Sequence, residues 1–95
     1  MENLSFPDRQ LRAEIAEIND QAIVLDGLDE AIVGTIEMFG KEPVVCYDRD
    51  IALDIIMDDT GGDRQEAEEY FEVNILGAYM GEGTPVFLSR TGVND

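Results

Sequence analysis

The sequence predicts a single α+β domain in which about four helices cover a small three-stranded sheet, in the order α-β-α-β-α-α-β. Apolar residues recur every three or four positions in several stretches, short apolar runs lie between them, and glycine, proline or aspartate marks most boundaries. Ninety-five residues suit one domain, and a hydrophobic content of 44% is typical of a folded chain rather than a disordered acidic tail. Residues 1–6 and 89–95 are expected to be loose.

The N-terminal half is expected to alternate helices with strands. A proline opens the first helix, Pro7–Ile18, at a position that suits proline, and its leucine and isoleucines share one face. A short apolar run predicts the first strand at Gln21–Leu25, and apolar residues spaced by three or four predict a second helix over Leu28–Phe39. The run Pro43–Tyr47 is apolar on both faces, so it is predicted to be the central strand. A helix between these two strands predicts that they are parallel.

The C-terminal half is expected to hold two capped helices and a last strand. Asp48 is a suitable N-cap for the third helix, Asp48–Asp59, and Asp63 begins a D-x-x-E capping pattern for the fourth. The fourth helix is predicted to run as far as the glycines at 81 and 83, and Thr84–Leu88 is predicted to be a strand. One face of the fourth helix is predicted to carry Ala67, Tyr70, Phe71, Asn74, Ile75, Ala78 and Tyr79.

Residues typical of catalysis are scarce in this chain. It has no histidine, which excludes a Ser-His-Asp triad or a Cys-His pair in the usual form. Its one cysteine, Cys46, lies in the predicted central strand, where a lone cysteine usually serves as a small apolar residue. The glycines of Gly81-Glu82-Gly83 follow a helix and precede a strand, which is the wrong order for phosphate binding at a helix N-terminus. The sequence therefore predicts a protein that is not an enzyme and needs no cofactor.

Metal sites and membrane segments are not predicted either. A chain with one cysteine and no histidine lacks the ligands of a structural zinc site, and residues 58–63 lack the spacing of an EF-hand loop. No run of about 18 apolar residues is present, and the first ten residues do not have the pattern of a signal peptide. A single cysteine suits a reducing compartment, so the predicted location is the cytoplasm.

Charge is the strongest signal in the composition. The chain has 22 acidic and 6 basic residues, a formal net charge of −16. Residues 42–72 hold eleven of the acids against two arginines, which is a net charge of −9 in about a third of the chain. Such a protein repels nucleic acid and anionic lipid and favours a partner with a basic surface. The alternative is that the charge serves only to keep the protein soluble.

Seven of these acids form the candidate partner-binding site. They are Asp50, Asp54, Asp58, Asp59, Glu68, Glu69 and Glu72. Three of the aspartates are spaced four residues apart, so they line one ridge of the third predicted helix at intervals of about 6 Å. The three glutamates form a second ridge on the next helix. Two such ridges are able to imitate a nucleic-acid backbone and occupy a groove lined by lysine and arginine, although an ordinary solvated helix face explains either ridge alone.

Four short motifs resemble those of small acidic proteins encoded by tailed bacteriophages and prophages. The motifs lie at residues 25–31, 46–48, 66–74 and 77–87, and the last of them, GAYMGEGTPVF, is the most specific. The similarity extends over about residues 22–88 and leaves out the N-terminal helix. It implies a phage setting and transfers no catalytic residues. Small accessory proteins of phages often bind and inhibit host proteins, as anti-CRISPR and anti-restriction proteins do.

Three functional hypotheses follow. The first is a non-enzymatic phage accessory protein of the host cytoplasm that inhibits a host nucleic-acid-handling complex through its acidic residues. The second is a structural or assembly module that forms a homo-oligomer through Tyr79 and Met80 or through the edge of the last strand. The third is a cation-dependent enzyme or calcium binder. Fast, salt-sensitive association is expected only for the first, because exposed charges are screened by salt.

Overall fold

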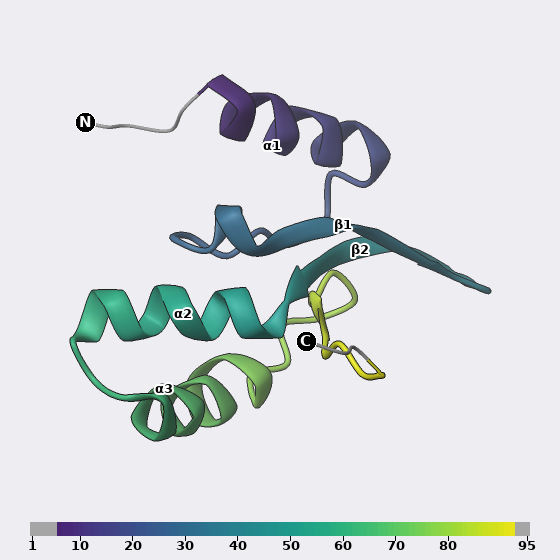
Figure 1. Ribbon diagram of the computed structural model, residues 1–95. Coiled ribbons are helices and arrows are strands. Elements are labelled where there is room, and N and C mark those ends of the chain that lie inside the picture. Colours follow the sequence, from purple (N-terminus) through teal and green to yellow (C-terminus); the bar gives the residue numbers. More distant parts are fainter. Residues whose placement is uncertain (1–5, 93–95) are drawn as a thin grey trace.

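A computed structural model describes the backbone of residues 6–92 and the side chains of residues 9–92. Its elements in chain order are α1 (Phe6–Ile18), the 3-10 turn η1 (Asp29–Ala31), β1 (Ile32–Met38), β2 (Lys41–Asp48), α2 (Arg49–Thr60), α3 (Arg64–Phe71), the π-helix η2 (Glu72–Leu76) and β3 (Val86–Leu88). The α+β class and the three strands agree with the prediction, whereas three α-helices stand in place of about four. In the view of Figure 1, α1 lies on one side of the β1–β2 hairpin, and α2 and α3 lie on the other.

The sheet is mixed, with the strand order β1-β2-β3. β1 and β2 form an antiparallel hairpin around the two-residue turn Phe39–Gly40, and Gly40 adopts a φ of +78° that favours glycine. β3 pairs parallel to β2, with Tyr47 opposite Phe87. The prediction that the strand around residues 43–47 is central is therefore confirmed.

Two elements of the N-terminal half were predicted wrongly. Leu28–Phe39 is not a helix, because its second half forms β1 after a single 3-10 turn. This segment is rich in β-branched residues, which prefer extended backbone, and the chain directly after it supplies an antiparallel partner. Gln21–Leu25 is not a strand, although Ile23 N donates a backbone hydrogen bond to Gly83 O at 3.0 Å. The parallel pair is accordingly β2 with β3, connected through α2 and α3 rather than through a helix at 28–39.

The two capped helices are confirmed at their N-termini. The Asp48 carboxylate accepts a hydrogen bond from Ile51 N at 3.0 Å, and Asp63 and Glu66 form both hydrogen bonds of a capping box. Gly61 ends α2 with a φ of +72°.

The fourth predicted helix is wrong in its last part. The α-helix ends at Phe71, a π-helix continues to Leu76, and residues 78–80 have no regular structure. Gly77 N donates to Glu72 O at 3.0 Å, and a Cβ at Gly77 would lie 2.9 Å from the same carbonyl oxygen, so this end of the π-helix requires glycine.

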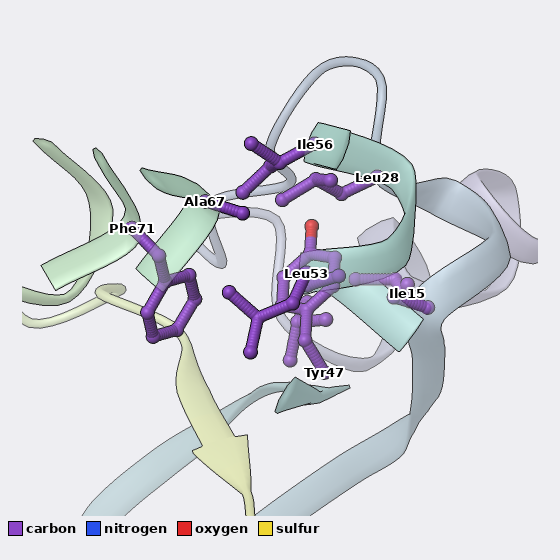
Figure 2. Close-up of a cluster of buried hydrophobic side chains, with 10 residues drawn as sticks. Ile15, Leu28, Tyr47, Leu53, Ile56, Ala67 and Phe71 are labelled. Carbon is purple, nitrogen blue, oxygen red and sulfur yellow. The ribbon is translucent and has the colours of Figure 1, made fainter. Parts of the chain in front are cut away.

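The hydrophobic core lies where the sheet meets α2 and α3, and Figure 2 shows its members. Tyr47, Leu53 and Phe71 are completely buried, and Ile15 of α1 joins them. Phe87 of β3 stacks on Tyr47 with ring centroids 5.7 Å apart and meets Phe71 edge-on at 4.9 Å. Aromatic residues of the last strand and of α3 therefore meet over the central strand.

Of the residues predicted to share one face of the fourth helix, Ala67 and Phe71 are buried, and Tyr70 and Tyr79 are exposed. Of the ends predicted to be loose, residues 1–5 and 93–95 lie outside the described part of the chain. Phe6 begins α1, and Arg90 donates to the buried Asp48 carboxylate at 2.7 Å.

Candidate functional site

The acidic ridge of α2 lies on the solvent side of that helix. Asp50, Asp54 and Asp58 are exposed, whereas the buried residues of α2 occupy the opposite face. Because the three carboxylates follow one another at intervals of four residues on a regular helix, they lie in a row at intervals of about 6 Å. Asp59 follows directly in sequence and lies on a different side of the helix, about 100° further round its axis.

Two arginines join this ridge to the acids of α3 and η2. Arg64 contacts Asp50 at 2.8 Å and Glu68 at 3.4 Å, so one guanidinium bridges the two helices. Arg49 contacts Glu72 at 3.2 Å and lies over the ring of Phe71 at 5.2 Å from its centroid. The structure thus brings the two predicted ridges together, and it neutralises part of each at their junction.

Four of the seven candidate acids have no ion pair within residues 9–92. They are Asp54, Asp58, Asp59 and Glu69. Two of them, Asp58 and Asp59, lie in the last turn of α2, which contains no basic residue. A negative charge there is unfavourable because the C-terminal end of a helix carries a partial negative charge. These carboxylates therefore do not stabilise the helix that carries them, and they are accessible to a cationic partner.

A cleft of about 330 Å³ lies beside Asp59 on the other side of α2. Its apolar walls come from three parts of the chain: Leu25 and Leu28 before β1, Ile56 in α2, and Tyr70 and Ile75 in α3 and η2. The segment that carries Leu25 is fixed to the core, since Leu25 N donates to the Tyr47 hydroxyl at 2.6 Å.

Asp26 brings a second carboxylate to the same cleft. Its side chain is 100% exposed, and Arg12 approaches it at 3.5 Å. This cleft was not predicted from the sequence, because it depends on the packing of three distant segments.

Large apolar side chains are also exposed away from this cleft, most strongly in the segment after α3 and at the tip of the β1–β2 hairpin. Val73 of η2 is 73% exposed and Tyr79 is 76% exposed, which agrees with the expectation that Tyr79 is accessible beside the glycine turn. Phe39, at the tip of the β1–β2 hairpin, is 102% exposed. The sequence prediction had placed Phe39 at the end of a helix and missed this feature.

Cys46 is buried in β2. Burial, and secondly the nearby Asp48 carboxylate, raises the pKa of the Cys46 thiol above its usual value. A protonated, inaccessible thiol is a poor nucleophile, so its surroundings favour the role of a small apolar residue.

Within the described residues, no three histidine, cysteine, aspartate or glutamate side chains are arranged to hold a metal ion. No helix in this part of the chain has the length and hydropathy of a membrane span. Comparison of the chain with protein-family models, with curated proteins and with solved structures found no match.

Proposed function

We propose that this chain is a non-enzymatic, phage-encoded accessory protein that binds a basic surface of a host protein in the cytoplasm and inhibits it. The observation that supports this function best is the pair of adjacent helices whose exposed carboxylates Asp54, Asp58 and Glu69 have no ion pair within the described residues. They belong to a chain with a net charge of −16. Carboxylates without a nearby cation repel one another and lower the stability of the folded protein. A basic partner that neutralises them removes this repulsion, which contributes favourably to the binding free energy.

The class of target follows from the spacing of the charges. A row of carboxylates at intervals of about 6 Å presents repeated negative charge along a line, as a nucleic-acid strand does. A groove lined by lysine and arginine for DNA or RNA is complementary to such a row. The proposed targets are therefore nucleic-acid-handling defence complexes, such as a CRISPR effector or a restriction enzyme, with the acidic helices competing for the nucleic-acid groove.

The two arginines have a defined role in this proposal. Arg64 of α3 pairs with Asp50 of α2 and with Glu68 of its own helix, and Arg49 of α2 pairs with Glu72 of η2. Holding the helices in one relative orientation lowers the entropy lost when the acidic surface docks. Asp54, Asp58 and Glu69 then supply the charge that meets the partner.

The test begins with capture of a partner from host lysate on the tagged protein, with washes at low and then high salt. Affinity of the captured partner is then measured for wild type, for a site variant (Asp54→Asn, Asp58→Asn, Glu69→Gln) and for a control variant. The control removes three exposed charges elsewhere by Glu14→Gln, Glu17→Gln and Glu37→Gln.

We expect the site variant to weaken binding at least about tenfold at low salt, which corresponds to about 1.4 kcal/mol, and the control to leave it near wild type. DNA should displace the protein from its partner. The proposal is wrong if the site variant binds as wild type does at low salt. Equal weakening by both variants would also contradict it, because the effect would then come from net charge alone.

A second candidate function, a homo-oligomeric assembly module, is favoured by the exposed apolar residues Val73, Leu76 and Tyr79 and by the two edge strands of the sheet. Light scattering at micromolar concentration tests it, and a monomer would remove it. If an oligomer forms, Tyr79→Ser should weaken it, whereas Asp54→Asn should not.

A further inference from the structure

The cleft beside α2 combines an apolar interior with negative charge at its border. Leu25, Leu28, Ile56 and Ile75 supply aliphatic walls, and Tyr70 supplies an aromatic one. Figure 2 shows Ile56 and Leu28 next to each other at one end of the core, where they contribute to this cleft. A volume of about 330 Å³ falls at the lower end of the range for ligand pockets, which suits one side chain or a small molecule.

Two carboxylates line the same cleft. Asp59 has no ion pair within the described residues. Asp26 is contacted by Arg12 at 3.5 Å, but that arginine is held mainly by the buried Asp29, to which it donates two hydrogen bonds of 2.7 and 2.8 Å. The fully exposed Asp26 side chain therefore remains accessible to a second cation. Apolar walls with two carboxylates match a ligand that has an aliphatic stem and a cationic head.

The walls of the cleft are fixed before any ligand arrives. The Tyr47 hydroxyl holds Leu25, the Arg12–Asp29 pair holds the start of η1, and Thr60 Oγ1 donates to Ile56 O at 2.9 Å. A site whose walls are already ordered loses little conformational entropy on binding, so even one side chain is able to contribute measurable affinity.

We propose that this cleft receives the side chain of a lysine or arginine from the bound protein, with the stem against Leu28, Ile56 and Tyr70 and the cationic head between Asp26 and Asp59. This inference deepens the proposed function and rests on it, because it assigns an anchoring position to the basic partner. It also gives Asp59 a role separate from the ridge of Asp50, Asp54 and Asp58, which faces another side of α2.

The probe is Nα-acetyl-arginine amide, added to the isotope-labelled full chain and followed through its backbone amide signals by NMR. Its matched control is Nα-acetyl-citrulline amide, which has nearly the same shape and no charge. We expect saturable shifts at residues 25–28, 59–60 and 70–75 with a dissociation constant in the millimolar range, and binding of citrulline amide about tenfold weaker or undetectable. Nα-acetyl-lysine amide should bind at the same residues.

Two variants with equal charge change locate the site. Asp59→Asn should weaken arginine-amide binding about fivefold, because it removes a charge-assisted contact. Asp54→Asn removes the same charge from the ridge of α2 and should leave binding unchanged. Both aspartates are exposed and lack an ion pair within the described residues, so both variants should keep the wild-type spectrum outside the substituted positions. Tyr70→Ala should weaken both the charged and the neutral probe, because it removes a wall rather than a charge.

The proposal is overturned if arginine amide and citrulline amide bind equally, because the positive charge would then contribute nothing. It is also overturned if Asp54→Asn weakens binding as much as Asp59→Asn, because the probe would then be attracted by the overall negative charge of the surface rather than by the cleft. In the assay with the captured partner, Asp59→Asn should lower the affinity, and the control variant with Glu14, Glu17 and Glu37 changed to glutamine should not. An affinity of Asp59→Asn equal to that of wild type would also overturn the proposal for the cleft. The probe experiment contains no partner, so its failure leaves the proposed function standing. Conversely, if the Asp54, Asp58 and Glu69 variant binds the partner as wild type does, the proposed function is wrong, but the binding of arginine amide to the cleft is unaffected.

Discussion

Replacing Asp48 by alanine removes a carboxylate that performs two tasks from one buried position. Asp48 is 2% exposed at the junction of β2 and α2. One oxygen caps α2 by accepting from Ile51 N at 3.0 Å, and the other accepts from Arg90 Nε at 2.7 Å. The Asp48→Ala variant loses both interactions and leaves no charge behind in the core.

The expected loss of stability is about 2 kcal/mol. An N-cap contributes about 1 kcal/mol, and an ion pair with one partner 54% exposed contributes at most about 1 kcal/mol, because solvent screens it. For a domain of this size, such a loss lowers the midpoint of thermal unfolding by roughly 10 °C. Asp48→Asn should lose about half as much, since asparagine caps helices as well as aspartate but lacks the charge.

Urea unfolding followed by far-UV circular dichroism measures these differences, with Asp54→Ala as the control that removes an exposed charge from the same helix. The control should stay within about 0.5 kcal/mol of wild type. A loss below 0.5 kcal/mol for Asp48→Ala, or a loss equal to that of the control, would refute the assignment of both interactions.

The pH dependence of stability gives an independent check. The pKa of Asp48 lies below its ordinary value of 3.8. The largest cause is the hydrogen bond from Ile51 N. Burial opposes it by favouring the neutral carboxyl, and the hydrogen bond from Arg90 lowers the pKa further. A carboxylate with a lowered pKa in the folded state contributes stability above its unfolded pKa, and this contribution is lost as pH falls through the folded value. The stability advantage of wild type over Asp48→Ala should therefore decrease as pH falls below the ordinary value of 3.8. An advantage that stays constant as pH falls through this range would contradict the linkage.

Three further predictions test other parts of the structure by urea unfolding. Tyr47→Phe should cost about 1–2 kcal/mol, because Leu25 N loses its acceptor in a partly buried position, and no loss would mean that water replaces the hydroxyl. Phe71→Ala should lower the free energy of unfolding by about 3–5 kcal/mol, because it leaves a cavity in the core. Tyr79→Ala changes an exposed side chain and should stay within about 0.5 kcal/mol of wild type. Similar losses for the two variants would contradict the burial of Phe71 and the exposure of Tyr79. Asp58→Lys should stabilise the protein by about 0.3–1 kcal/mol, because it places a cation in the last turn of α2, and destabilisation would mean that the aspartate has an unrecognised partner.

Local signals were sufficient to predict the helix starts. The Asp48 cap and the Asp63–Glu66 capping box each join a side chain to backbone only three residues away, so the sequence contains the whole interaction. The central strand was predictable for a related reason. A strand with neighbours on both edges and helices packed on it needs apolar residues on both faces, and residues 43–47 have them.

The first strand was not predictable from its own pattern. A strand with one buried face alternates apolar and polar residues, but β1 is an edge strand with two irregularities in its register against β2, and Val33 and Ile36 are both partly exposed. The isoleucines at 32 and 36 match helical spacing as well as strand spacing. Pairing with β2 decided between the two, and pairing is a property of the folded chain.

The candidate site shows the same division between local and tertiary information. The ridge of Asp50, Asp54 and Asp58 follows from helix geometry alone. Its junction with the acids of α3 depends on where Arg64 and Arg49 point, which only the packing of two helices decides. Two acidic ridges on adjacent helices were expected. In the structure, arginines pair with Asp50, Glu68 and Glu72 of these ridges.

The position of β2 between an antiparallel and a parallel neighbour has a consequence for the order of folding. Its hairpin partner β1 is reached through a two-residue turn, whereas Arg90, just after β3, meets Asp48 from 42 positions away. Closing the longer loop costs more chain entropy, and α2 and α3 must be placed before β3 is able to pair. Contacts of β3 should therefore be absent from the folding transition state, so weakening them should accelerate unfolding and leave the folding rate nearly unchanged.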